Sequence, residues 1–382
     1  MRVRDLAFIH WIKSVGPVDI SLVRSAVARC PVSLLGLTPA DLVTSLPGEF
    51  GYQPLLDAIA ARYEVTPRQV MTVSGGTTFA NWVACVAALD GAPRDAEVIV
   101  ERPTYEPLLR LPDALGYRVR RFDRRLDEDY AIDLDRFASV VNRRTRLALV
   151  TNLHNPSGAR IDLRTLRAMA RILARVNALL LVDDVYLECL SAERPVSSIK
   201  AGPNVVTTSS LTKAYGLDGL RAGWILGPKD LIARANTLHN LVMNNRVAPG
   251  EQMMFAAFRR LDAIRAHGHT WLDPNLARLR RYFARETRFT TLMPEGGNVF
   301  FPRLPRGLDG DRFATHLLTR YSTLVVPGRF FESPRHIRFS VGIRPSLLER
   351  GLRNLSQTLD DLAPVRAAAR PRPARAALGK IL

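Results

Sequence analysis

Residues 207–224 decide the fold of this chain, and they read TTSSLTKAYGLDGLRAGW. The stretch begins as a β-rich run, passes through hydroxyl residues to Lys213, and ends in a glycine-rich segment. Lysine is rare, because only five of the 54 basic residues are lysines. An amine can lose its proton and attack a carbonyl carbon, whereas a guanidinium cannot. Ser210 and Arg221 can each bind an anion and lie on either side of Lys213, so the pattern favours a reactive amine over a solvated surface lysine.

The composition indicates a large folded protein. The chain has 382 residues, of which 47% are hydrophobic and 24% charged, and this allows two domains. No apolar run reaches the roughly 18 residues of a membrane span, and the N-terminus lacks a signal-peptide pattern. The three cysteines and seven histidines form neither a disulfide framework nor a metal-ligand spacing. We therefore expect a cytoplasmic protein without a metal or membrane contact.

The net charge of +18 is compatible with nucleic-acid binding. The arginines, however, are spread along the whole chain, and no DNA-binding module precedes the enzyme-like part. Some of the excess lies in residues 364–382, which we interpret as a flexible basic tail. We expect no nucleic-acid partner. A preference for acidic substrates and simple compositional drift both remain open as explanations for the remaining charge.

A strand, a glycine turn and a helix start follow one another in residues 70–81. Glycines let the backbone approach an anion closely, and a helix N-terminus offers unpaired N–H groups. Gly76 is followed by Thr77 and Thr78, whose hydroxyls can donate to the same anion. Such a turn is weak evidence alone, because it is usually only structural. The chain has no Gly-x-x-x-x-Gly-Lys motif, which disfavours a nucleotide phosphate.

Further strands are predicted near residues 98, 148, 180 and 206, with helical stretches between them. This alternation is typical of a mostly parallel sheet, whose ligands bind at the carboxyl ends of the strands. Asp183 ends a continuously apolar strand, where a carboxylate is costly unless it is paired. Asp184 is the better candidate for a helix N-cap. Tyr105 also follows a strand, and it is about as well explained as a core tyrosine when taken alone.

These motifs together resemble the class I/II aminotransferases, which are fold-type I enzymes that depend on pyridoxal 5'-phosphate (PLP). The resemblance extends from about Gly51 to about Leu362. It implies an α/β large domain with a mostly parallel central sheet at residues 46–280 and a smaller α+β domain at 281–363. Residues 1–45 would form an N-terminal arm, with a helix-like run at 22–28 that could lie over an active site. The family also implies a homodimer.

The resemblance implies a role for each motif. Lys213 corresponds to the Schiff-base lysine, and Asp183 to the carboxylate that keeps the pyridine nitrogen protonated. Tyr105 would stack on the ring, while Asn155 of the Asn-Pro-Ser-Gly turn and Tyr186 would bond its phenolic oxygen. The residues that would hold the phosphate are Gly76, Thr77, Thr78, Ser210 and Arg221. Arg338, in an Arg-x-Ser-x-Gly pattern, would bind the substrate α-carboxylate together with Asn155, since a guanidinium holds a carboxylate through two parallel bonds.

The reaction that this implies is transfer of an amino group between an amino acid and a 2-oxo acid, with Lys213, Asp183 and Tyr186 as the catalytic residues. The later motifs are also similar to those of capreomycidine-synthase-type members, so a lyase or cyclase is the alternative. A PLP-sensing transcription regulator is disfavoured, because fewer than 75 residues precede the phosphate turn. A catalytically idle scaffold is disfavoured by the intact Lys213, Asp183 and Arg338.

Overall fold

The computed structural model describes residues 5–46, 50–190 and 194–363. The predicted basic tail at 364–382 lies outside the described residues. A seven-stranded sheet forms the centre of the molecule, in the order β2-β8-β7-β6-β5-β3-β4. Strand β8 is antiparallel to both of its neighbours, β2 and β7, and the other strand pairs are parallel, so the prediction of a mostly parallel sheet is confirmed. The strands are β2 (Val70–Ser74), β3 (Glu97–Arg102), β4 (Arg118–Asp123), β5 (Thr145–Thr151), β6 (Leu179–Asp183), β7 (Val205–Ser210) and β8 (Ala222–Leu226).

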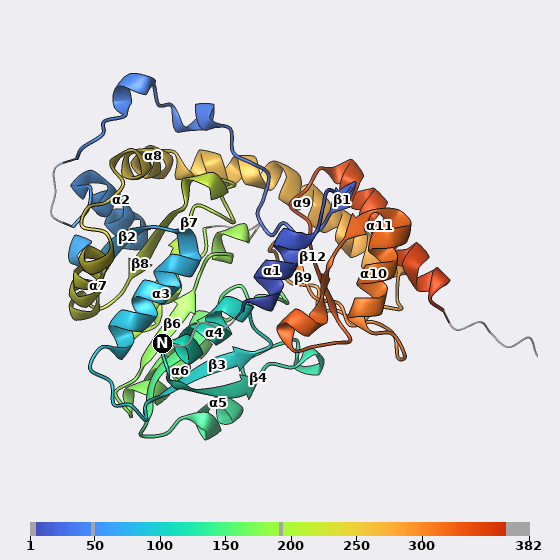
Figure 1. Ribbon diagram of the computed structural model, residues 1–382, viewed down its shortest axis with the longest axis horizontal. Helices are drawn as coiled ribbons and strands as arrows, with labels where there is room; N and C mark the ends of the chain where they lie inside the picture. The colour runs from blue at the N-terminus through green and yellow to red at the C-terminus, as the bar shows by residue number, and fades with distance from the viewer. Residues whose placement is uncertain (1–4, 47–49, 191–193, 364–382) are drawn as a thin grey trace, which may run out of the picture.

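Helices cover both faces of this sheet (Figure 1). Successive strand residues point to opposite faces, and Val98 and Val100 accordingly belong to one apolar cluster while Ile99 belongs to another. Helices α3 (Gly76–Leu89) and α7 (Lys229–Val242) pack in the first cluster, with α4 (Glu106–Ala114) beside them. Helices α5 (Leu134–Val140) and α6 (Leu163–Ala174) pack in the second. Burial on both faces explains the continuously apolar strands of the sequence.

The C-terminal part forms a second, smaller layer of strands and helices (Figure 1). A three-stranded antiparallel sheet has the order β11-β12-β9. The elements of the C-terminal layer are β9 (Val299–Phe300), α10 (Gly310–Tyr321), β10 (Thr323–Leu324), β11 (Val326–Pro327), β12 (Ile337–Ser340) and α11 (Pro345–Asp361). Three further helices link the C-terminal layer to the central sheet or pack beside the central sheet: α2 (Gln53–Tyr63), α8 (Ala248–Arg259) and the long α9 (Leu261–Arg285). The domain limits at residues 46–280 and 281–363 stay a prediction.

The N-terminal segment contains α1 (Ala7–Ser14) and β1 (Ile20–Ser21), which pairs with β10. The helix suggested for residues 22–28 is wrong, because this run is irregular, with bends at Ala26 and Ala28. Its backbone groups bond to distant partners instead of to each other: Leu22 N donates to Leu324 O at 2.9 Å, and Val27 N donates to Lys213 O at 3.0 Å. Such pairing with the surrounding structure overrides a weak local helix preference. The run therefore connects the small sheet to the loop that carries Lys213.

Two structural findings concern the expected localisation and metal content. Among the helices of the described ranges, none combines the length and the apolar character needed to cross a membrane. In the same ranges, no three His, Cys, Asp or Glu side chains gather in a way that could hold a metal ion. Cys30, Cys85 and Cys189 are buried and free. The cytoplasmic location stays a prediction.

Candidate active site

A cavity of about 300 Å³ lies at the carboxyl ends of the central strands. Nine of the eleven predicted site residues line it: Thr77, Thr78, Tyr105, Asn155, Asp183, Tyr186, Lys213, Arg221 and Arg338. The other two adjoin this lining, since Thr77 Oγ1 donates to Ser210 Oγ at 2.7 Å and a Cβ on Gly76 would lie 3.0 Å from Arg221 Nη2. The fold thus brings together every residue that the sequence singled out.

Lys213 follows β7 and extends its amine into the cavity. Its Nζ donates a hydrogen bond to Ser25 Oγ at 3.0 Å and lies 5.9 Å from the centroid of the Tyr186 ring. Removal from water, followed by the positive charge of Arg338, lowers the pKa of Lys213 to about 8. The uncharged amine is therefore a minor form at pH 7, far more populated than for an ordinary lysine, and this is the form that can act as a nucleophile or a base.

Asp183 ends β6 and is 6% exposed. Its carboxylate accepts hydrogen bonds from Asn81 Nδ2 at 2.8 Å and from Val185 N at 3.0 Å. Asn81, on α3, is itself fixed by Thr208 Oγ1, which donates to Asn81 Oδ1 at 2.5 Å. Burial raises the pKa of Asp183 to about 6, although the two hydrogen bonds oppose this shift. Such a carboxylate is oriented into the cavity and lacks a cationic partner of its own within hydrogen-bond distance among the described residues.

Asp184 makes a different set of contacts from its neighbour. Its carboxylate accepts from Ser197 Oγ at 3.0 Å and from Ser198 N and Oγ at 3.0 and 2.6 Å. These bonds anchor the short 3₁₀ turn at Ser198–Ala201. The expectation that Asp184 is a helix N-cap is therefore wrong, because Tyr186 is the N-cap of the turn that follows it and Ser197 is the N-cap of the turn at Ser198–Ala201. Burial raises the pKa of Asp184 to about 7.

One end of the cavity is built to hold an anion. It meets the N-terminus of α3, where backbone N–H groups and the helix dipole favour negative charge. Gly76 has φ +67, a backbone conformation that favours glycine. The Arg221 guanidinium stands beside it and donates from Nη2 to Gly75 O at 2.6 Å. The hydroxyls of Thr77 and Thr78 complete this end.

Arg338 stands at the other end, on β12, and is 2% exposed. Nη1 donates to Asn155 Oδ1 at 3.2 Å and Nη2 to Val23 O at 3.4 Å, whereas the buried Nε has no hydrogen-bond partner. The rings of Phe8 and Phe331 lie 5.3 and 5.1 Å from its guanidinium carbon. A buried guanidinium with an unused donor is suited to binding a carboxylate.

Four residues of this region were not identified from the sequence. Ser25 and Phe8 line the cavity, Asn81 orients Asp183, and Glu106 binds the first turn of α1. Asn81 follows Thr77 by four residues and so lies on the same face of its helix, which is a spacing that could have identified it. The other three act across long sequence separations, and no local pattern marks them.

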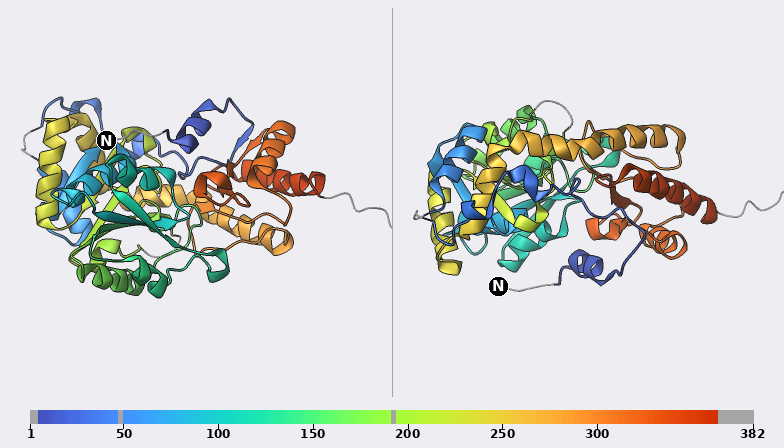
Figure 2. Two further views of the ribbon diagram at one scale, coloured as in Figure 1. Left: turned by 60° about the horizontal axis from the view of Figure 1, so that its bottom comes forward. Right: turned by 90° about the horizontal axis from the view of Figure 1, so that it is seen from above.

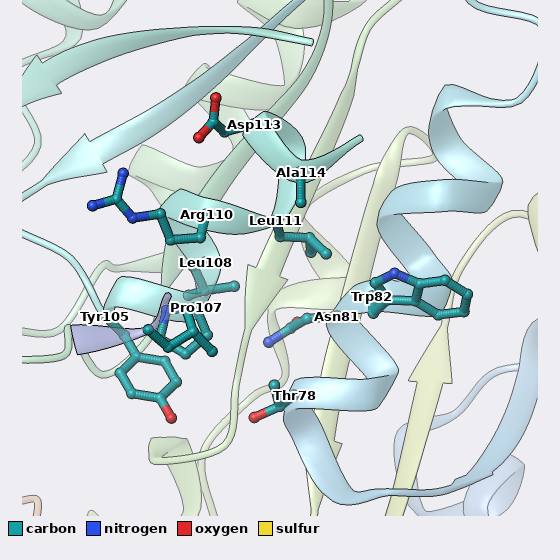
Figure 3. A pocket seen from close by; sticks show the side chains of 11 residues that line it. Thr78, Asn81, Trp82, Tyr105, Pro107, Leu108, Arg110, Leu111, Asp113 and Ala114 are labelled. Carbon is teal, nitrogen blue, oxygen red and sulfur yellow. The ribbon is translucent and has the colours of Figure 1, made fainter. Parts of the chain in front are cut away.

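A second cavity, of about 210 Å³, lies between α3 and α4 (Figure 3). Tyr105 and Thr78 line both cavities, so they separate the apolar space from the active-site cavity. The other walls of the second cavity are mostly apolar and include Trp82, Leu108 and Leu111. Figure 3 shows Arg110 and Asp113 at the side of this cavity away from Thr78.

An amine, a buried carboxylate and an anion cradle at this edge of a parallel sheet define a site for an aldehyde cofactor that carries a phosphate. Comparison with known proteins makes the assignment specific. The family described as aminotransferase class I and II matches residues 43–355, and the chain belongs to this family.

Several relatives show the range of the family around this chain. Capreomycidine synthase of Streptomyces vinaceus is 31% identical over 330 residues, which cover 86% of this chain and 84% of that enzyme. The arginine–pyruvate transaminase of Pseudomonas aeruginosa is 27% identical over 277 residues, or 68% of each chain. A synthase and a transaminase are thus both among the relatives of this chain.

Solved structures confirm the fold-type I architecture. A PLP-dependent aminotransferase from Streptococcus suis 89-1591 superimposes with a TM-score of 0.87 at 22% identity, covering 95% of this chain and 100% of its own. The PLP-dependent cyclase OrfR superimposes with a TM-score of 0.84 at 27% identity, covering 94% of this chain and 98% of its own. The protein is an enzyme of the PLP-dependent aminotransferase-fold family, and its cofactor is PLP.

The residues present fit this cofactor. The anion cradle at Gly76 and Arg221 matches a phosphate in charge and in donors, and a Cβ at Gly76 would fill the space. Lys213 offers an amine for the aldehyde, and Asp183 offers a buried carboxylate for the ring nitrogen. The unused Nε of Arg338 is left for a carboxylate at the opposite end.

Proposed function

We propose that the protein is an aminotransferase that moves an amino group between an amino acid and a 2-oxo acid. PLP, when bound, supplies an electron-withdrawing ring that stabilises negative charge at the Cα atom of the substrate. Lys213 attaches the cofactor, and the phosphate is held by Gly76, Thr77, Thr78, Ser210 and Arg221. Asp183 holds a proton at the ring nitrogen, while Asn155 and Tyr186 bond the phenolic oxygen and Tyr105 covers the ring.

The substrate is oriented by Arg338, whose guanidinium binds the α-carboxylate, and Asn155 holds that guanidinium in place. The amine of Lys213, when it is not attached to the cofactor, would be placed to take the proton from Cα of the substrate and to give it back as an acid. A general base is most effective when its pKa lies near the working pH, and burial lowers the pKa of the Lys213 amine to about 8. The same group then serves as base and acid.

The observation on which we base transamination is that two groups among the described lining residues, Lys213 and Asp183, have pKa values shifted to within about one unit of neutral pH, and that Lys213 is the one of these two not assigned to the ring nitrogen. Burial raises the pKa values of Tyr105 and Tyr186, which keeps both phenols protonated. Asp218 is paired with Arg24 at 3.2 Å, and Asp183 is assigned to the ring nitrogen. Transamination can be completed by this one group, because it moves one proton between two positions.

Isotope labelling tests this proposal. The PLP-loaded enzyme is incubated with a panel of ¹⁵N-labelled amino acids and with 2-oxo acids, and the products are measured by mass spectrometry. Transfer of ¹⁵N to the carbon skeleton of the oxo acid is the expected result. Exchange of the Cα hydrogen in D₂O, measured in parallel, reports the proton step that transaminases and cyclases share. No exchange with any amino acid would contradict the role of Lys213 as the base.

A cyclase is the second candidate, and the relatives favour it. Capreomycidine synthase has the higher identity of the two curated relatives described above, and the PLP-dependent cyclase OrfR covers nearly the whole chain. In the labelling experiment, a cyclase would exchange the Cα hydrogen but keep the ¹⁵N in a product derived from the amino acid alone. That outcome would show that the enzyme catalyses cyclisation and not transamination.

The uptake of PLP should depend on pH through the amine of Lys213. Only the uncharged amine attacks the aldehyde, and burial places the pKa of Lys213 at about 8. The rate at which apoprotein takes up PLP should therefore rise roughly tenfold per pH unit below pH 8 and level off above it. Stopped-flow absorbance between pH 6 and pH 10 measures this. A rate that continues to rise beyond pH 10, as for an exposed lysine, would contradict the assignment.

Ser25 should support the proton-carrying step. Its Oγ accepts a hydrogen bond from Lys213 Nζ at 3.0 Å, and its side chain is 8% exposed. Such a bond contributes about 1 kcal/mol, so Ser25→Ala should lower kcat roughly fivefold and leave KM nearly unchanged. Ser25→Thr keeps the hydroxyl and should restore most of the rate. If Ser25→Thr is as slow as Ser25→Ala, the hydroxyl is not what matters.

We also propose that the enzyme is a homodimer. Phe50, Leu241, Val242 and Val247 are between 45% and 80% exposed. The segments that carry them meet around a polar pocket that includes Gly51, Asn244 and Ala248. Large exposed apolar side chains gathered in one region favour a protein interface. Sedimentation velocity measures the oligomeric state, and a monomer at micromolar concentration would contradict this proposal.

A further inference from the structure

Helix α1 lies on the outside of the molecule (Figures 1 and 2), and its residue Phe8 lines the active-site cavity. Its first turn is bound by Glu106, a residue of α4 that is 7% exposed. The Glu106 carboxylate accepts hydrogen bonds from Ala7 N at 3.1 Å and from Phe8 N at 2.7 Å. A carboxylate at the free N–H groups of a helix N-terminus is favourable, and here it comes from a separate helix. This contact fixes the position of α1 over the site.

The side chain that α1 places in the site is Phe8, which is 7% exposed and lines the cavity. Its ring lies edge-on to Tyr105 at 6.1 Å between centroids and 5.7 Å from Phe330. The guanidinium carbon of Arg338 lies 5.3 Å from the same ring. Phe8 therefore stands directly beside the two residues that we assign to the ring and to the substrate carboxylate.

The charges around the cavity limit what else the substrate can present. Among the described residues that line the active-site cavity, Asp183 and Asp218 are the two that carry a carboxylate. The first faces the proposed ring nitrogen, and the second is paired with Arg24. No acidic side chain among these lining residues is left to pair with a cationic side chain, and Arg24 is already neutralised. The remaining wall, formed by Phe8, Val23 and Tyr105, is apolar or aromatic.

We propose that Phe8 is a selectivity residue whose ring forms the wall for the substrate side chain, so that the enzyme takes amino acids with uncharged, apolar side chains. This inference rests on the proposed function, because it takes Arg338 as the anchor of the α-carboxylate. An apolar side chain packed on Phe8 loses contact with water, and this burial favours binding. A guanidinium or a second carboxylate would lose its hydration there without gaining a partner.

Binding of unreactive carboxylates tests the proposal without relying on turnover. The PLP-loaded enzyme is titrated with 4-methylpentanoate, 4-guanidinobutyrate and glutarate, and isothermal titration calorimetry gives each Kd. All three carry a carboxylate for Arg338, and they differ in the group that would meet Phe8. We expect 4-methylpentanoate to bind most tightly. Phe8→Ala should weaken its binding roughly tenfold and change the other two less than twofold.

Ile9→Ala is the matched control, because Ile9 lies on the same helix and packs in the same aromatic cluster without lining the cavity. It should leave all three Kd values unchanged. Tighter binding of 4-guanidinobutyrate by the unaltered enzyme, or an equal loss for all three ligands in Phe8→Ala, would overturn the inference. Failure of all three to bind, or binding of all three that Arg338→Ala leaves unchanged, would instead refute the carboxylate site of the proposed function.

Discussion

Replacing Lys213 by alanine should reduce turnover by about 10⁴-fold or more, the largest effect expected of any substitution in this enzyme. The residue has two proposed tasks, which are attachment of PLP and transfer of the Cα proton, and alanine removes both. The hydrogen bond from Nζ to Ser25 disappears with it, but the surrounding backbone bond from Val27 N to Lys213 O remains. The folded structure should therefore persist. Steady-state assays with the best amino acid of the labelling panel measure the loss.

The control is Lys229→Ala, which removes an exposed lysine at the start of α7. That variant should keep full activity and take up PLP normally. The melting temperature of Lys213→Ala, measured without PLP, should lie close to that of the unaltered protein, because the amine is not part of a buried ion pair among the described contacts. Retention of more than a tenth of the activity would mean that another group performs the proton step.

Asp183→Asn should have the second largest effect, lowering kcat by about 10²- to 10³-fold. Asparagine has the same shape and can keep the hydrogen bond from Val185 N, but it lacks the negative charge that holds a proton at the ring nitrogen. The bond from Asn81 Nδ2 would also meet a neutral oxygen or an opposing amide group. We expect weaker PLP binding together with the loss of rate, and equilibrium dialysis against PLP measures the first.

Asp184→Asn provides a matched comparison, since the two carboxylates are adjacent and both buried. The carboxylate of Asp184 accepts three hydrogen bonds from Ser197 and Ser198 and does not line the cavity. This variant should lose about 1–3 kcal/mol of stability in a urea unfolding experiment and keep its kcat. If the two variants lose the same fraction of kcat, the charge of Asp183 supports the rate by stabilising the fold and not by contacting the cofactor.

Much of the fold could be predicted from the sequence because its signals are local. The apolar run at 178–182 indicates a strand buried on both faces, and the strands near residues 98, 148, 180 and 206 are all present in the structure. The glycine turn before Thr77 and the polar residue at each strand end are equally local features. Because parallel strands align their carboxyl ends, knowing these ends places the predicted residues in one cavity.

The N-terminal segment could not be predicted in this way. Residues 22–28 have a helix-like pattern but form an irregular run, because their backbone groups bond to β10, β12 and the lysine loop. Ser25 and Lys213 are 188 residues apart in the sequence, and Phe8 and Glu106 are 98 apart. No periodicity or turn signal encodes such pairings. The part of the site that we connect with selectivity is therefore the part that only the structure reveals.

The most direct test of this account is to locate the lysine that carries PLP. The PLP-loaded protein is reduced with borohydride, digested, and analysed by peptide mass spectrometry. Our account predicts one phosphopyridoxyl group per chain, on Lys213, in the peptide that contains Leu211 and Tyr215. Stable modification of Lys13, Lys200, Lys229 or Lys380 instead, or no modification at saturating PLP, would contradict it.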